Sequence, residues 1–285
     1  MSRIDQTLGE ATQRLTDSHQ ARREQSDTAR LDAEVLLCHV LDKPYSYLFT
    51  WPEKELSHEQ SQQFEALIEQ RTKGTPVAYL TGEKEFWSLK LKVSPSVLIP
   101  RPDTELLVEL ALAMPLADDA TVADLGTGSG AIALAMAAER PQWKVIGVDR
   151  LPEPVATSKD NARLNQISNV TFVEGSWCSP LPNQLDMIVS NPPYIREDDE
   201  HLAQGDVQFE PRSALTAGKD GLDDIRTIST QALEKLKPGG WLLFEHGYDQ
   251  SEEIQNILAS CGYESIETRQ DLSNQDRVTL AQKQV

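Results

Sequence analysis

The chain has 285 residues, of which 39% are hydrophobic, and a formal net charge of −18 at pH 7. This length allows one large domain or two smaller ones, with a core that needs no disulfides. The acidic charge argues against a protein that binds nucleic-acid backbones, because such proteins present a basic surface. Three cysteines without CxxC spacing and five scattered histidines indicate neither a disulfide framework nor a metal site. With no apolar signal core at the start and no run of membrane-spanning length, we expect a cytoplasmic protein without a membrane partner.

Residues 1–75 predict a small helical bundle, because apolar residues recur at helical spacing. The positions with this spacing are Ile4, Leu8, Ala11 and Leu15 in one segment, and Leu31, Val35, Leu36 and Val40 in the next. Ser57, with Gln60 three residues later, predicts a capping box at the start of another helix. That helix is expected to end near Lys73.

In residues 76–100 the spacing of apolar residues changes from helical to alternating, which predicts a β-hairpin linker. Trp87, Leu89, Leu91 and Val93 alternate with polar residues, as is typical of a half-buried strand, and residues 81–84 predict a turn ahead of it. After the linker, Asp103 is the expected N-cap of a helix that continues through Leu112.

Residues 101–285 predict an α/β domain in which strands and helices alternate. Strands are expected at 121–125, 144–148, 170–173, 185–190 and 240–245, and helices at 130–139, 153–165, 222–236 and 249–260. This alternation is typical of a doubly wound, Rossmann-like parallel sheet with right-handed crossovers. Two further stretches, near 264–269 and 277–281, are expected to pair at one edge.

A glycine-rich loop follows the first of these strands and opens a helix. The residues that we assign to its ligand site are Asp124, Gly126, Thr127, Gly128, Ser129 and Gly130. Glycines let a ligand approach the backbone closely, and Asp149, at the end of the next strand, is placed to accept ribose hydroxyls. A dinucleotide and S-adenosylmethionine both fit this pattern, which does not choose between them. For S-adenosylmethionine, Asp124 is well placed to meet the ammonium group.

A rigid loop, Asn191-Pro192-Pro193-Tyr194, follows the buried strand 185–190. Its two prolines fix two φ angles and disfavour helix in the preceding residues. The first and fourth strands flank the switch point of such a sheet, so this loop is expected beside the glycine loop. The Asn191 side chain and the Pro192 carbonyl would hold two N–H groups of an amide, and Tyr194 would pack on its plane. The pattern favours methylation of an amide or exocyclic-amine nitrogen, catalysed by positioning and electrostatics.

The chain resembles the HemK/PrmC family of methyltransferases along nearly its whole length. The segments that carry the resemblance are 76–82, 85–87, 98–105, the glycine loop, 191–195 and 209–211. The resemblance implies a class I methyltransferase fold, S-adenosylmethionine as cofactor and peptide chain release factors as protein partners. It also implies the reaction, which is N5 methylation of the glutamine in a Gly-Gly-Gln motif.

Residue roles also follow from the resemblance. The segment Gly126–Gly130, Asp149 and Trp177 are expected to contact the cofactor, and Asn191 both cofactor and substrate. The expected glutamine pocket consists of Pro192, Pro193 and Tyr194, with Asn191, Pro192 and Tyr194 as the catalytic set. Arg101 and Glu210 either organise the substrate side or form a structural salt bridge. His246 stands where isoleucine is expected and is predicted to be a hydrogen-bonded loop histidine.

Three other functions fit the sequence less well. A ribosomal-protein glutamine methyltransferase is not expected to carry the Pro-Arg-Pro-Asp-Thr-Glu sequence of residues 100–105. An adenine-N6 nucleic-acid methyltransferase would need a basic face, and a non-enzymatic adaptor would not need the intact 191–194 loop. The helical domain 1–75, too small for a site of its own, is expected to be a substrate-docking module.

Overall fold

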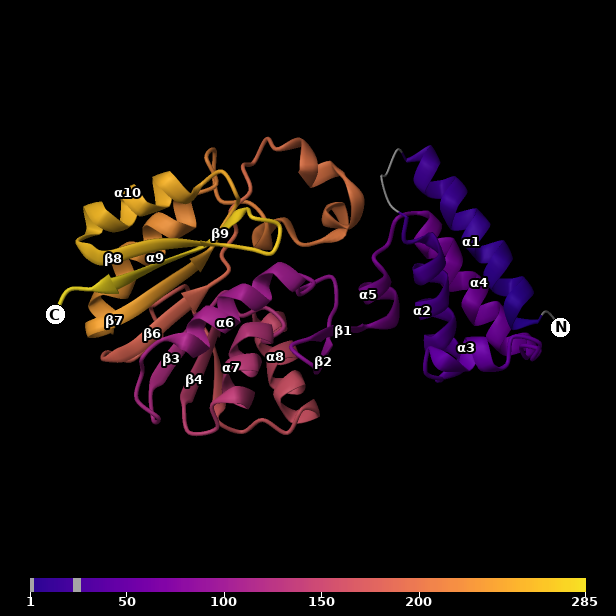
Figure 1. Ribbon diagram of the computed structural model, residues 1–285, viewed down its shortest axis with the longest axis horizontal. Helices are drawn as coiled ribbons and strands as arrows, with labels where there is room; N and C mark the ends of the chain where they lie inside the picture. Colours follow the sequence, from indigo (N-terminus) through magenta and orange to yellow (C-terminus); the bar gives the residue numbers. More distant parts are fainter. Residues whose placement is uncertain (1–2, 23–26) are drawn as a thin grey trace. The chain divides into compact units, whose positions relative to one another are not determined.

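A computed structural model describes residues 3–22 and 27–285 of the chain (Figure 1). The chain divides into two compact units. The first comprises Met1–Gly82 and Glu200–Phe209, and the second comprises Glu83–Asp199 and Glu210–Val285. Within the described ranges, no helix combines the length and the apolar character that crossing a membrane requires.

The first unit is a bundle of helices. These are α1 (Ile4–Ala21), α2 (Ala29–Leu41), α3 (Ser46–Thr50), α4 (His58–Thr72) and α5 (Val77–Thr81). Their shared core includes Ile4, Leu8, Leu15, Leu36, Leu37, Phe64 and Ile68. The predicted capping box of α4 is confirmed: the Gln60 amide donates to Ser57 Oγ at 3.1 Å, and the Ser57 amide donates to Gln60 Oε1 at 2.9 Å.

The buried face of α2 differs from the one that apolar spacing predicted. Leu31 and Val35 are 51% and 36% exposed, whereas Ala33 and Leu37 are completely buried. Ala29, Ala33, Leu36 and Leu37 form the buried stripe of α2, which leaves Leu31 and Val35 outside the core. The bundle is therefore as predicted, but two of its presumed core residues lie on the surface.

The segment Glu200–Phe209 belongs to the first unit, although the residues on either side of it in the sequence belong to the second. It contains two 3₁₀ turns, η2 (Glu200–Ala203) and η3 (Gly205–Phe209). Buried Arg71 bonds both to Asp32 at 2.7 Å and to Asp206 in η3 at 2.9 Å. This pair of ion pairs therefore links the segment Glu200–Phe209 to α4.

The second unit begins with an antiparallel hairpin of β1 (Glu83–Phe86) and β2 (Leu89–Lys92). Its turn residues are Trp87 and Ser88, with φ of +52° and +59°, as in a two-residue turn that matches strand twist. The hairpin is confirmed, but placing Trp87 in the strand and the turn at 81–84 was wrong. Thr81 ends α5, and the Trp87 indole instead donates to Glu139 Oε1 at 2.9 Å.

The helix after the linker is α6 (Glu105–Ala113), and its predicted cap is also wrong. Asp103 lies inside a 3₁₀ turn, η1 (Pro102–Thr104), and α6 has no side-chain cap. Pro102 has a φ suited to the first position of that turn, and α6 therefore starts at Glu105, one residue later than predicted. Thr104 takes the N-cap position, and its hydroxyl accepts a hydrogen bond from Asn191 instead.

A seven-stranded sheet forms the body of the second unit, in the order β5-β4-β3-β6-β7-β9-β8. The strands are β3 (Thr121–Leu125), β4 (Lys144–Asp149), β5 (Val170–Glu174), β6 (Leu185–Ser190), β7 (Leu236–Glu245), β8 (Tyr263–Gln270) and β9 (Asp276–Lys283). The first five are parallel, and β9 is antiparallel to both β7 and β8. The predicted doubly wound sheet and its paired edge strands are confirmed.

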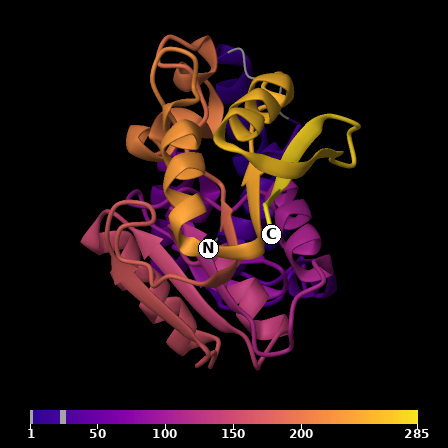
Figure 2. The same ribbon diagram turned by 90° about the vertical axis from the view of Figure 1, so that its left-hand side faces the viewer.

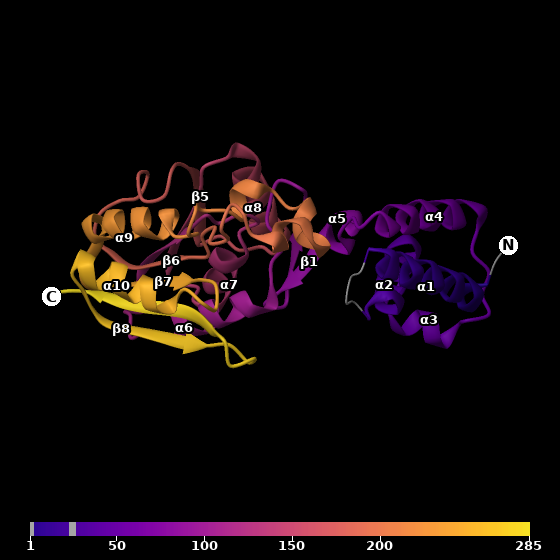
Figure 3. The ribbon, with the colours of Figure 1, turned by 90° about the horizontal axis from the view of Figure 1, so that it is seen from above.

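Helices cover both faces of this sheet. On one face lie α6, α7 (Ala131–Glu139) and α8 (Pro152–Leu164). On the other, α9 (Asp223–Lys235) and α10 (Ser251–Cys261) lie side by side (Figures 2 and 3). A further 3₁₀ turn, η4 (Arg212–Ala214), precedes α9.

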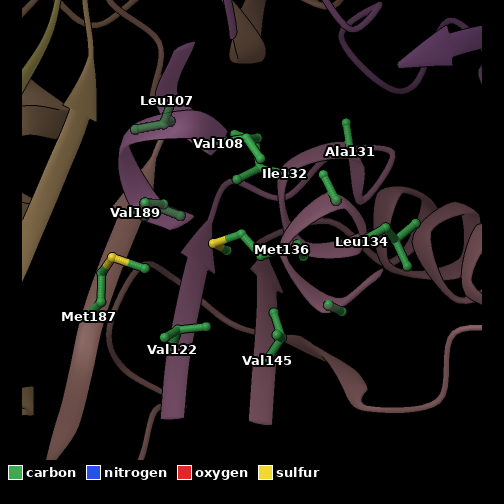
Figure 4. Close-up of a cluster of buried hydrophobic side chains, with 14 of the residues drawn as sticks. Leu107, Val108, Val122, Ala131, Ile132, Leu134, Met136, Val145, Met187 and Val189 are labelled. Atoms are coloured by element: carbon green, nitrogen blue, oxygen red, sulfur yellow. The ribbon is translucent and has the colours of Figure 1, made fainter. Parts of the chain in front are cut away.

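Side chains alternate between these two faces along each strand. Val122 of β3 and Val189 of β6 pack with Met136 of α7 (Figure 4). Leu125 and Ile188 of the same strands belong to the opposite cluster, under α9 and α10. Strands β3 and β6 are therefore buried on both faces of the sheet.

Gly147, in the middle of β4, provides a test of this packing. A Cβ there would lie 2.4 Å from the Phe172 ring, whereas a Cβ at Gly9 in α1 would meet nothing within 4 Å. We expect Gly147→Ala to lower the free energy of unfolding by about 1–3 kcal/mol through overpacking. The same change at Gly9 should raise it by about 0.5–1 kcal/mol, because alanine favours helix. Urea denaturation followed by circular dichroism measures both, and equal effects would contradict the packing described.

Candidate active site

A cavity of about 360 Å³ lies within the second unit, at the carboxyl ends of β3, β4 and β6. Six of the residues predicted for the site line it: Gly126, Gly128, Asp149, Trp177, Asn191 and Pro193. The strand register explains why they meet. Leu125 of β3 pairs with Ser190 of β6, so the glycine loop and the 191–194 loop leave the sheet side by side.

The glycine loop bends sharply around this cavity. Gly126, Gly128 and Gly130 have φ of +69°, +55° and +85°, a region that other residues rarely adopt. A Cβ on Gly130 would come within 3.0 Å of Ser158 and 3.1 Å of the Phe172 ring. The first two glycines thus open the loop to the cavity, and the third lets α7 start against the neighbouring elements.

Asp124 holds the glycine loop from behind. Its Oδ2 accepts the Thr127 hydroxyl at 2.6 Å and the Ala133 amide at 3.2 Å. The carboxyl is completely buried, and its burial raises the pKa of Asp124 to about 7. Asp124, Thr127, Ser129 and Gly130 do not line the cavity, so their predicted contact with a cofactor stays a prediction.

Asp149 ends β4 and presents its carboxylate at the cavity. One oxygen accepts the Gly128 amide at 3.0 Å and the other accepts the Leu151 amide at 3.1 Å. Each carboxylate oxygen has further acceptor capacity. The backbone therefore fixes the orientation of this carboxylate and still leaves it able to accept two ligand hydroxyls.

Trp177 forms another wall of the cavity. Its ring lies 3.5 Å from the position that a Cβ on Gly126 would occupy. The Trp177 side chain hydrogen-bonds to Asp224 near the start of α9, and burial raises the pKa of that carboxyl. Asp224 was missed from the sequence, where the Asp223-Asp224 pair resembles any acidic helix start.

The 191–194 loop is fixed by bonds on several sides. Asn191 Nδ2 donates to Thr104 Oγ1 at 3.2 Å, and the Tyr194 carbonyl accepts the Gln250 side chain at 2.9 Å. The Tyr194 hydroxyl lies 3.5 Å from Glu245 Oε1, and burial raises the pKa of Tyr194. Asn191 and Pro193 line the cavity, whereas Pro192 and Tyr194 do not.

Two other predicted residues are also located. Arg101 and Glu210 form an ion pair in which the Glu210 side chain is completely buried, and Glu210 also accepts the Ile99 amide at 3.2 Å. His246 is fully buried, and its ring nitrogens bond to the Gly247 carbonyl and the Thr279 hydroxyl, both at 2.8 Å. The prediction of a satisfied histidine is confirmed.

The sheet order, the glycine loop and the cavity beyond the strands define a class I methyltransferase fold. A methyltransferase from Pyrococcus furiosus has this fold, with a TM-score of 0.54 and 19% identity over 78% of this chain and 98% of its own.

Sequence comparisons specify the family. Residues 6–82 match the model of the PrmC N-terminal domain, and residues 102–210 match that of the methyltransferase small domain. The release factor glutamine methyltransferase of Vibrio cholerae is 54% identical over 98% of this chain and 96% of its own length. Its counterpart from Escherichia coli K12 is 48% identical over 90% and 92% of the two chains. The chain belongs to the family of release factor glutamine methyltransferases, and it is a methyltransferase.

Proposed function

We propose that this protein transfers a methyl group from S-adenosylmethionine to the side-chain amide nitrogen of a release-factor glutamine, in a Gly-Gly-Gln motif. The observation that carries the proposal is the placement of Asn191 and Pro193 beside Gly126 and Gly128 around one cavity. The family to which the chain belongs supports the same reaction and substrate.

The cavity suits an adenosine ligand with a charged tail. Asp149 offers two oriented acceptors for the ribose hydroxyls. Gly126 and Gly128, without side chains, let the ligand approach the backbone, and Trp177 provides a flat apolar wall. When bound, S-adenosylmethionine would supply an electrophilic methyl group to the substrate nitrogen, which would lose one proton in exchange for the methyl group.

Asn191 prepares the substrate side of the cavity. Because its Nδ2 donates to Thr104, its carbonyl oxygen remains available to accept an N–H of the substrate amide. A second N–H would be held by the carbonyl of Pro192, in a loop that the two prolines stiffen. Holding both hydrogens directs the nitrogen lone pair at the methyl group, so the residues act through positioning and electrostatics.

Asp149→Ala tests the cofactor assignment. Removing the carboxylate leaves buried ribose hydroxyls without acceptors, which should weaken S-adenosylmethionine binding by about 1–3 kcal/mol. Isothermal titration calorimetry on wild type and variant measures this difference. The wild type should not bind a nicotinamide dinucleotide comparably, and unchanged affinity in Asp149→Ala would refute the ribose assignment.

Asn191→Ala tests the catalytic assignment. We expect the single-turnover rate at saturating S-adenosylmethionine to fall by about 10²–10³, because one preorganised acceptor at the reacting amide is lost. Asn191→Asp retains acceptor oxygens but removes the donor to Thr104 and should be nearly as slow. A rate for Asn191→Ala within a few-fold of wild type, with the protein folded, would make the loop a structural turn and refute the mechanism.

We also propose that the helical unit docks the release factor, through an apolar surface that α2 and α3 expose. Leu31 and Val35 share a face of α2, and Tyr45 and Phe49 pack with ring centroids 5.1 Å apart. The Tyr45 hydroxyl donates to Glu34 of α2 at 2.5 Å, which joins the two pairs. These four residues are 36–59% exposed, and clustered exposed apolar side chains are typical of a docking site for protein.

Phe49→Ser and Leu31→Ser test this docking surface. Each should raise KM for folded release factor by roughly 5- to 30-fold, the loss expected for one apolar contact worth about 1–2 kcal/mol. Turnover of a short Gly-Gly-Gln peptide should not change. Leu272→Ser, at a fully exposed leucine in the β8–β9 turn, is the matched control. If the patch variants behave like the control, docking lies elsewhere.

A further inference from the structure

We propose that Glu245 is a positioning residue for methyl transfer, which acts through the Thr104 hydroxyl to set the orientation of the Asn191 carboxamide. This inference rests on the proposed function for its effect on rate. It assigns a role to a carboxyl group that the mechanism above does not use.

Glu245 is the last residue of β7, and it lies 2% exposed beneath the 191–194 loop. Its Oε1 is 3.5 Å from the Tyr194 hydroxyl, and a hydrogen bond from the Thr104 side chain lowers the pKa of the same carboxyl. Its Oε2 has no hydrogen-bond partner in the part of the chain that the structure describes. A carboxylate buried with so few partners costs stability, which a role at the adjacent loop would explain.

The direction of the hydrogen bonds follows from this carboxylate. An ionised carboxylate only accepts, so the single Thr104 hydrogen is donated to Glu245. Thr104 Oγ1 is then an acceptor towards Asn191, and it accepts a hydrogen bond from Asn191 Nδ2 at 3.2 Å. The Asn191 oxygen is therefore left to accept from the substrate. If the Asn191 amide were flipped, its N–H groups would instead face the N–H groups of the substrate.

Titratable groups from three elements face Glu245. They are Tyr194 on its loop, Asp103 in η1 and Arg277 in β9. The Arg277 guanidinium bonds to Asp271 at 3.1 Å and to the His246 carbonyl at 3.2 Å, rather than to Glu245. Burial, the largest cause, raises the pKa of Glu245 to about 7. Below this pH a protonated Glu245 can donate to Thr104, which frees the Thr104 hydrogen and removes the constraint on Asn191.

A double-mutant cycle tests the inference. Glu245→Gln and Thr104→Val should each slow single-turnover methylation of release factor by about 10- to 100-fold, the usual effect of removing a hydrogen-bond partner that orients a functional side chain. The double variant should be no slower than the slower single variant, because both remove one chain of bonds. S-adenosylmethionine affinity and KM for release factor should stay near wild type. Thr104→Ser, which keeps the hydroxyl, should restore most of the rate.

The matched control is Asp186→Asn, the same carboxylate-to-amide change at the far end of β6. Asp186 accepts the Thr121 amide and the Lys237 ammonium, both at 2.8 Å, and lies outside the site. The wild-type rate should rise as the pH passes about 7, and this limb should be absent in Glu245→Gln. A rate for Glu245→Gln equal to that of the control, or additive losses in the cycle, would overturn the inference.

A second readout separates this inference from the proposed function. In ¹⁵N-labelled protein, the Asn191 side-chain NH₂ signals, assigned by comparison with Asn191→Ala, should exchange slowly with water in the wild type and fast in Thr104→Val and Glu245→Gln. If the wild type methylates no release factor, the proposed function fails, and this exchange still decides the orienting role. Equal exchange in all variants would refute it.

Discussion

The parallel pairing of β3 with β6 is the constraint on which the site depends. In this register Leu125 lies opposite Ser190, so the next residues of both strands enter the same space. Chain connectivity reverses there. The strands β4 and β5 extend the sheet on one side of β3, whereas β6 and β7 extend it on the other side. The cavity lies at this switch point, where no crossover covers the strand ends.

Around that cavity, the protein's own hydrogen bonds hold its polar groups in place. Two backbone amides orient Asp149, Asp124 fastens the glycine loop, and Thr104 holds the Asn191 amide. Two of the carboxyls that do not line the cavity, Asp124 and Glu245, are fully buried, and burial raises the pKa of each to about 7. A reaction that relies on positioning needs such fixed dipoles, because reorienting them during the reaction would add to the barrier.

The sequence was sufficient for features that depend on local pattern and known topology. Strand and helix alternation predicted the sheet, and the positions of Asp149 and Asn191 after strands predicted that they meet. Long-range packing was less accessible: Leu31 has the same helical spacing as buried Leu36, and only the packing of the neighbouring helices determines which side of α2 faces the core. The bond from Asn191 to Thr104 joins residues 87 positions apart, and no spacing rule indicates it. The role of Glu245 could not be predicted for the same reason, since a carboxylate at the end of a strand does not by itself indicate which residues it contacts.

The central claim is that this cavity methylates a release-factor glutamine. The most direct measurement is mass spectrometry of a release factor after incubation with the protein and S-adenosylmethionine, in parallel with Asn191→Ala. We predict the mass of one added methyl group on the glutamine of the Gly-Gly-Gln motif with the wild type and almost none with the variant. An unmodified glutamine after incubation with folded, S-adenosylmethionine-bound wild type, or a methyl group on a different residue, would contradict the account.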